Sequence, residues 1–159
     1  MTSDFAIALH ILGFLASRRG EPLTSEEMAR TYGTSPVIVR RVLGKLRRAG
    51  LVESRRGSGG GSVLARSPGA INLRQAYEAV SPEPRVLPRH PSRCNEVVPV
   101  VVSQFINDTC AEAERALLRS LEDVTVERMD RTVRSRIRRA MTPGGSVAIQ
   151  RLRSGGEDS

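Results

Sequence analysis

The chain has 159 residues, enough for one modest domain with an appendage or for two small subdomains that share a core. Hydrophobic residues make up 39% of it and aromatic residues only 3%, so its core must be aliphatic. The formal net charge of +8 indicates a polyanionic partner. No apolar stretch approaches the ~20 residues that cross a bilayer, and the first residues lack the pattern of a signal peptide. We therefore expect a soluble, cytoplasmic protein without a membrane partner.

The positive charge is concentrated in one part of the chain. Residues 34–56 contain seven basic residues and one acid, a net charge of +6. Residues 94–121 contain two arginines and four acids, a net charge of −2. A basic patch beside a neutral-to-acidic remainder is typical of a nucleic-acid-binding protein, whereas a generic basic protein spreads its charge.

Two helices are predicted near the N-terminus. Apolar residues at helical spacing predict the first from Ser3 to Ala16. The run Thr24-Ser25-Glu26-Glu27 has the form of a capping box, in which the first and last side chains satisfy each other's backbone amides. It begins a short second helix, which Gly33 ends.

A third helix is predicted to begin sharply, with Ser35 as its N-cap and Pro36 at its first position. Gly50 ends it. Its apolar residues follow the i, i+3, i+4, i+7 rule and face the core: Val39, Val42, Leu43 and Leu46. The opposite side carries a basic and partly apolar set: Val37, Arg41 and Arg48, flanked by Arg40 and Lys45.

A β-hairpin and a short helix are predicted next. Leu51 to Ser54 is expected to form one strand and Val63-Leu64 the returning strand. The eight residues between them, from Arg55 to Ser62, form a flexible, basic, glycine-rich tip. Leu73 to Val80 is then predicted to be helical.

The rest of the chain divides into a linker, two helices and a tail. Four prolines between Ser81 and Arg93 predict a linker. Apolar residues three or four apart predict one long helix from Val98 to Leu121, although its start could also pass for a strand. Thr125 caps a last helix built on Met129, Val133 and Ile137, and disorder is expected from Thr142. The predicted parts are thus residues 1–80, 81–97, 98–140 and 141–159.

This order of elements is that of a winged helix-turn-helix. Such a fold places the N-terminal residues of its second helix against base edges in the major groove, where Arg40 and Arg41 would lie. Lys45 and Arg55 would neutralise phosphates, and Arg56 would enter the minor groove. Singly, an exposed basic helix is usually just solvated and a glycine-serine run is usually a linker. Together they predict a mainly α protein with an N-terminal winged helix-turn-helix and a long additional helix.

Residues 24–61 also resemble a known family. The run from Thr24 to Leu51 and the Ser-x-Arg-Gly-x-Gly-Gly-Gly motif from Ser54 to Gly61 are similar to the Rrf2 family of bacterial transcriptional regulators. The opening run from Asp4 to His10 fits as well, and the resemblance extends over about residues 3–133. One departure is Ser62, where an aromatic residue is common.

The resemblance implies a homodimer built on the long helix, with each winged domain bound to half of an inverted-repeat operator. The family is mostly repressive. Its DNA-contacting positions correspond here to Ser35, Val37, Arg40, Arg41 and Arg56. Independently, a long helix with an aliphatic stripe and no partner of equal length in the chain favours pairing between subunits. The alternative is that this helix packs only on its own N-terminal domain.

Many members of the family hold an iron–sulfur cluster on three closely spaced cysteines before the dimer helix. This chain has only Cys94 there, and Cys110 lies about 24 Å further on if the interval is helical. A cluster on these cysteines with Asp4 and a histidine (His10 or His90) is the less favoured alternative, so we expect no cofactor and no metal. Cys94, next to a basic residue, is a candidate redox thiol, and Cys110 is expected to be core.

Other function classes stay open to different degrees. A redox- or metal-responsive sensor using Cys94 is one alternative, and a non-specific nucleic-acid-binding winged-helix protein is another. An enzyme is not expected, because the H-E-x-x-H, G-x-S-x-G and P-loop patterns are absent from the sequence. A pure adaptor would have no use for three arginines on one surface. The operator, the regulated genes and the effector are not encoded in any visible motif.

Overall fold

The computed structural model describes residues 3–81 and 96–141. Its elements are, in chain order, α1 (Ser3–Ser17), α2 (Ser25–Tyr32), α3 (Pro36–Arg48), β1 (Val52–Arg55), β2 (Gly61–Leu64), the 3-10 helix η1 (Pro68–Ala70), α4 (Leu73–Val80), α5 (Val97–Glu122) and α6 (Val126–Ala140). The predicted mainly α fold class is confirmed. Nearly all of the predicted linker, the predicted tail, Cys94 and His90 lie outside the described residues.

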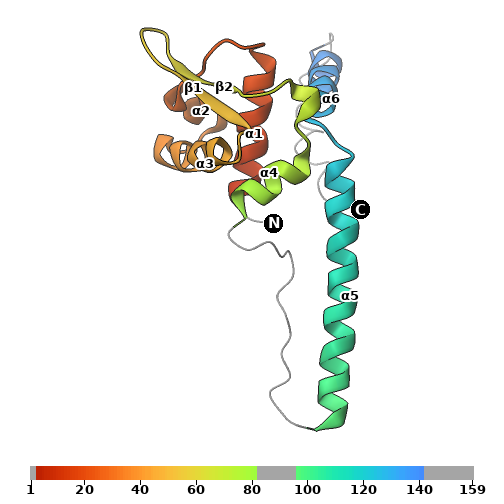
Figure 1. Cartoon of the computed structure of the whole chain (residues 1–159). Coiled ribbons are helices and arrows are strands. Elements are labelled where there is room, and N and C mark those ends of the chain that lie inside the picture. The colour runs from red at the N-terminus through yellow and green to blue at the C-terminus, as the bar shows by residue number, and fades with distance from the viewer. Residues whose placement is uncertain (1–2, 82–95, 142–159) are drawn as a thin grey trace.

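Helix α1 lies at the centre of the folded body, in contact with α3, α4, α6 and β2 (Figure 1). Its residues Ile11, Leu12 and Leu15 are fully buried. Helix α3 adds the four apolar residues that its sequence spacing predicts: Val39, Val42, Leu43 and Leu46. The core is therefore mainly aliphatic, with the edge-to-face pair Phe5 and Tyr77 as its aromatic members, and it lies directly behind the helix that carries the basic residues.

The two strands form an antiparallel hairpin in which Val52 pairs with Leu64 and Arg55 with Gly61. The first strand begins and ends one residue later than predicted, and the second begins two residues earlier. Leu23, just before α2, forms an isolated bridge with Ser62. The second strand of the hairpin therefore also pairs with the loop before α2, and the hairpin lies beside the helix-turn-helix as a wing (Figure 1).

Helix α5 is 26 residues long and runs away from the folded body (Figure 1). The strand alternative for its first residues is wrong, since the helix begins at Val97. Near its end, Leu118 and Leu121 pack against the core. The Leu73 amide donates to the Val124 carbonyl and the Val126 amide to the Ile71 carbonyl, both at 2.9 Å. These bonds tie the α5–α6 junction to the start of α4, so that α6 returns along α1.

Candidate nucleic-acid interface

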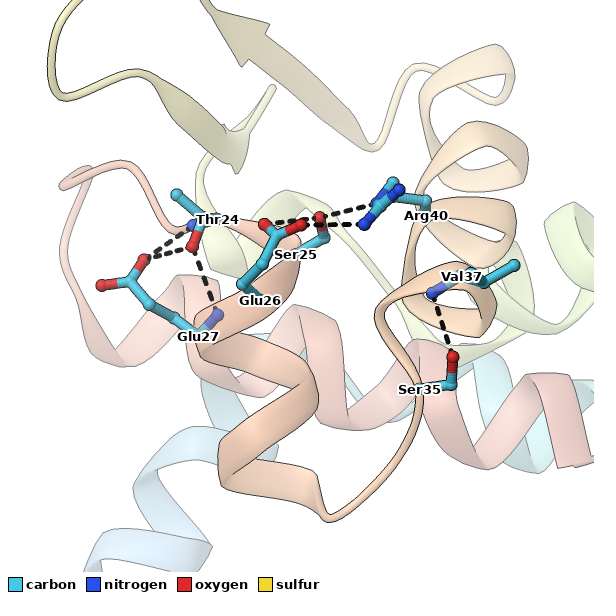
Figure 2. Close-up of polar contacts among 7 residues, drawn as sticks. All are labelled: Thr24, Ser25, Glu26, Glu27, Ser35, Val37 and Arg40. Carbon is cyan, nitrogen blue, oxygen red and sulfur yellow. Dashed lines mark hydrogen bonds and ion pairs between the residues drawn. The ribbon is translucent and has the colours of Figure 1, made fainter.

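Helices α2 and α3 are joined by a tight turn whose ends are fixed by caps. Thr24 and Glu27 form the predicted capping box: each backbone amide donates to the other side chain, at 2.8 and 3.2 Å (Figure 2). The Thr24 amide, followed by the Thr24 hydroxyl, lowers the pKa of the Glu27 carboxyl. Gly33 ends α2 with φ +73°, a left-handed conformation that glycine adopts without steric cost.

The first residues of α3 face solvent. The Ser35 hydroxyl accepts a hydrogen bond from the Val37 amide at 3.3 Å and so caps the helix (Figure 2). The Val37 side chain is 68% exposed although it is apolar. A single exposed apolar side chain is common on protein surfaces, so its exposure shows that Val37 is accessible and no more.

Arg40 is exposed on α3 and pairs with α2. Its guanidinium donates to the Glu26 carboxylate at 2.8 Å and to the Ser25 hydroxyl at 3.2 Å (Figure 2). Both members of this ion pair are 58% exposed. An ion pair so open to water contributes little free energy, so Arg40 exchanges this partner for another anion at small cost.

Arg41 and Lys45, one turn apart on α3, share a single partner on α1. The Asp4 carboxylate accepts from Arg41 at 2.5 Å and from Lys45 at 2.8 Å. The Lys45 ammonium also donates to the Val80 carbonyl at the end of α4, at 3.0 Å. The Lys45 side chain is 23% exposed, against 57% for Arg41. Lys45, which the sequence predicts to neutralise a DNA phosphate, is thus already paired within the protein.

The wing carries Arg55 and Arg56, both exposed. Arg55 ends β1 and donates to the Gly20 carbonyl at 3.1 Å, which fixes it beside the loop after α1. Arg56 follows in the hairpin turn. The predicted DNA-contacting side chains of α3 and the wing thus belong to one exposed N-terminal unit.

This arrangement defines a winged helix-turn-helix DNA-binding protein. The family model Rrf2, described as an iron-dependent transcriptional regulator, matches residues 1–131. The chain belongs to the Rrf2 family, as its sequence predicts, and is a DNA-binding transcriptional regulator rather than an enzyme.

The chain is similar to HTH-type transcriptional regulators and to the solved structure of a regulator. The chain is 31% identical over 131 residues to a putative HTH-type transcriptional regulator of Bacillus subtilis, YwnA, covering 78% of this chain and 96% of that protein. It is 42% identical over 67 residues to the regulator IscR of Cereibacter sphaeroides, covering 42% of this chain and 43% of that protein. The structure of CymR, the global cysteine regulator of B. subtilis, matches with a TM-score of 0.62 at 24% identity over 83% of this chain and 96% of that one.

The family description names iron, and an iron site needs several His, Cys, Asp or Glu side chains around one point. Among residues 3–81 and 96–141, no three His, Cys, Asp or Glu side chains come together to hold a metal ion. Asp4 is committed to its two cationic partners. Cys110 is partly exposed on α5, so the expectation that it is core is wrong: α5 projects from the body. The described residues do not fit an iron site.

Three contacts of this surface have no sequence signature. The sequence offers Asp4 only as an alternative metal ligand, yet its carboxylate pairs with Arg41 and Lys45, 37 and 41 residues further along the chain. Glu26 stands out in the sequence only as part of the capping-box run, yet it pairs with Arg40, 14 residues away. His10 stacks on Tyr32 with ring centroids 4.1 Å apart, and partial burial lowers its pKa below the usual 6.5. Each pairing depends on how helices cross, which local spacing does not reveal.

The described part of the chain contains α-helices of 8 to 26 residues. None has both the length and the apolarity that a bilayer span requires.

Proposed function

We propose that the protein binds an inverted-repeat operator as a homodimer and represses transcription there. Helix α3 lies in the major groove, with Arg40 and Arg41 against base edges and Val37 against a thymine methyl group. Arg55 and Arg56 of the wing contact the adjacent backbone and minor groove. The observation that carries the proposal is the exposed start of α3, capped by Ser35, beside a basic wing fixed to the same unit.

The dimer is supported by the exposed apolar half of α5. Five large apolar side chains at its start are half or more exposed, with Phe105 at 70%: Val97, Val98, Val101, Val102 and Phe105. An apolar surface of this kind on one helix is typical of a protein–protein contact. Two copies that bury it against each other would place two winged domains on opposite halves of a symmetric site. Repression then requires only that the dimer occupies its operator, because the bound dimer excludes polymerase from the same stretch of DNA.

The proposal is tested by selecting duplexes from a random-sequence pool and footprinting the protein on the winners. We expect an inverted repeat whose two half-sites lie about one helical turn apart, 34–36 Å centre to centre. Transcription from a promoter that overlaps this repeat should fall when the protein is added. A pool that yields no preferred sequence would instead favour the non-specific nucleic-acid-binding alternative.

A further inference from the structure

The Asp4 carboxylate is a buried counter-charge for the DNA-facing helix. Its side chain is 11% exposed, and one oxygen accepts from Arg41 while the other accepts from Lys45, at 2.5 and 2.8 Å. A carboxylate with so little access to water needs a cationic partner, because a buried charge without one is strongly destabilising. Of its two partners Lys45 is the less exposed, so the Asp4–Lys45 pair is the more costly to break.

Lys45 is held by three helices at once. It belongs to α3, pairs with Asp4 of α1 and donates to the Val80 carbonyl at the end of α4, at 3.0 Å. Two of its three ammonium hydrogens are therefore used inside the protein. Its 23% exposure leaves little room for a phosphate.

Arg40 provides the contrast within the same helix. Its partner Glu26 is 58% exposed, as Arg40 itself is, so water screens the pair and competes for both groups. Of these three cations of α3, Arg40 is easily released, Arg41 is oriented by a buried carboxylate but still 57% exposed, and Lys45 is withheld.

We propose that Asp4 is a specificity-determining residue: it withholds Lys45 from the DNA backbone and holds Arg41 in one orientation for base contact. The inference rests on the proposed function, because it requires α3 to face DNA. Phosphate contacts raise affinity for all sequences equally, whereas oriented base contacts raise it for one. Removing a free cation from α3 and orienting another both increase the ratio of specific to non-specific affinity.

The decisive variant is Asp4→Asn, which keeps the shape of the side chain and removes its charge. Binding is measured against the duplex selected by the wild type and against an unselected random-sequence duplex of equal length, over a range of salt. We expect the Asp4→Asn variant to bind the random duplex about fivefold more tightly than the wild type does at physiological salt. Each added phosphate contact contributes about 0.9 to the slope of log affinity against log salt, and this gives the expected gain. The plot of log affinity against log salt should steepen by about 1, or by about 2 if Arg41 also moves to a phosphate. Affinity for the selected duplex should not rise as much, so the specificity ratio falls.

Matched variants separate this effect from a general gain of charge. Glu26→Gln also removes one acid beside a cation of α3, but from an exposed pair, and should leave the salt slope unchanged. Asp4→Glu keeps the charge and should retain the wild-type slope. Asp4→Asn combined with Lys45→Met should return the slope toward the wild type.

Lys45→Met alone gives a second test that does not require Asp4→Asn to fold. If Asp4 withholds Lys45, removing the ammonium leaves the salt slope on random duplex unchanged. If Lys45 is a free phosphate contact, the slope becomes shallower by about 1, which would overturn the inference. Thermal unfolding of each variant identifies those that are folded.

Arg40→Ala and Arg56→Ala, assayed alongside, keep the inference distinct from the proposed function. If they weaken binding while Asp4→Asn is folded and changes neither slope nor ratio, the interface stands and the role of Asp4 is wrong. If neither arginine affects DNA binding, the proposed interface itself is wrong.

Discussion

Leu23 and Ser62 exchange two backbone hydrogen bonds, from amide to carbonyl at 3.0 Å in one direction and 2.8 Å in the other. The pair joins the loop before α2 to the second strand of the wing. Gly61, the neighbouring residue, lies so close that a Cβ there would be 2.7 Å from the Leu23 carbonyl group. The wing is therefore joined directly to the helix-turn-helix, as the proposed contact of both with one DNA segment requires.

Gly61→Ala should destabilise the protein, because the added methyl group meets backbone atoms that cannot rotate away. We expect a loss of about 1–3 kcal/mol in the free energy of unfolding, measured by chemical denaturation. Gly44→Ala is the matched control: Gly44 lies within α3, and apart from its chain neighbours and the adjacent backbone of its own helix nothing lies within 4 Å of an added Cβ. It should stabilise the protein by about 0.5–1 kcal/mol through helix propensity. Equal effects of the two changes would show that the close approach at Leu23 is not structurally important.

Arg40→Ala and Arg41→Ala should each weaken binding to the selected duplex by about 1–3 kcal/mol if they make bidentate base contacts. Affinity for random duplex should change less. Fluorescence anisotropy with both duplexes at one salt concentration measures the difference. Equal losses on the two duplexes would mean that α3 contacts only phosphates.

Phe105→Glu should dissociate the proposed dimer, because it places a charge within the exposed apolar half of α5. Sedimentation at micromolar concentration should shift from dimer to monomer, and operator affinity should fall since the two half-sites are no longer linked. Ala111→Glu adds the same charge at another exposed position of α5 and serves as the control. A wild-type chain that sediments as a monomer and binds DNA one-to-one would refute the dimer.

Acidification should reduce stability through His10. Partial burial lowers the pKa of His10 below 6.5, so the unfolded chain binds more protons than the folded one as pH falls through this range. The contribution of His10 to stability is complete above pH 6.5 and is lost progressively below it. His10→Gln should flatten the change in unfolding free energy between about pH 7.5 and about pH 5.5, above the range of ordinary carboxyl groups. The ion pair Asp130–Arg134 lines the same groove between α1 and α6 as His10. Because this pair is present in both the wild type and the His10→Gln variant, the difference between the two reports on His10.

The protein should bind its operator without a cofactor. Aerobically purified protein should be colourless and active, and Cys94→Ser should leave affinity within about threefold under reducing conditions. If Cys94 is a thiol switch, oxidation should weaken only the wild type. Brown protein from anaerobic purification, with stoichiometric iron and sulfide and altered DNA binding, would contradict this expectation.

The sequence by itself determined the elements whose signals are local. The capping box at Thr24, the Ser35-Pro36 start of α3 and the apolar spacing of α3 each depend on residues within one or two turns, and each forms as predicted. Several ends moved by a residue or two: the last residue of α1, both ends of α5, both ends of β1 and the first residue of β2. Element ends are the part of a structure that local sequence signals determine least.

Tertiary structure alone decided which cations of α3 are available. In the sequence, Arg40, Arg41 and Lys45 are simply three basic residues of one helix. The groups that pair with Arg41 and Lys45 are Asp4 and the Val80 carbonyl. They belong to α1 and α4, which pack against α3 only in the folded chain. Likewise, the sequence predicts Cys110 to be core, yet it is partly exposed, because α5 leaves the body instead of crossing it (Figure 1). Spacing along one helix fixes which residues share a face, and only the packing of helices fixes what that face meets.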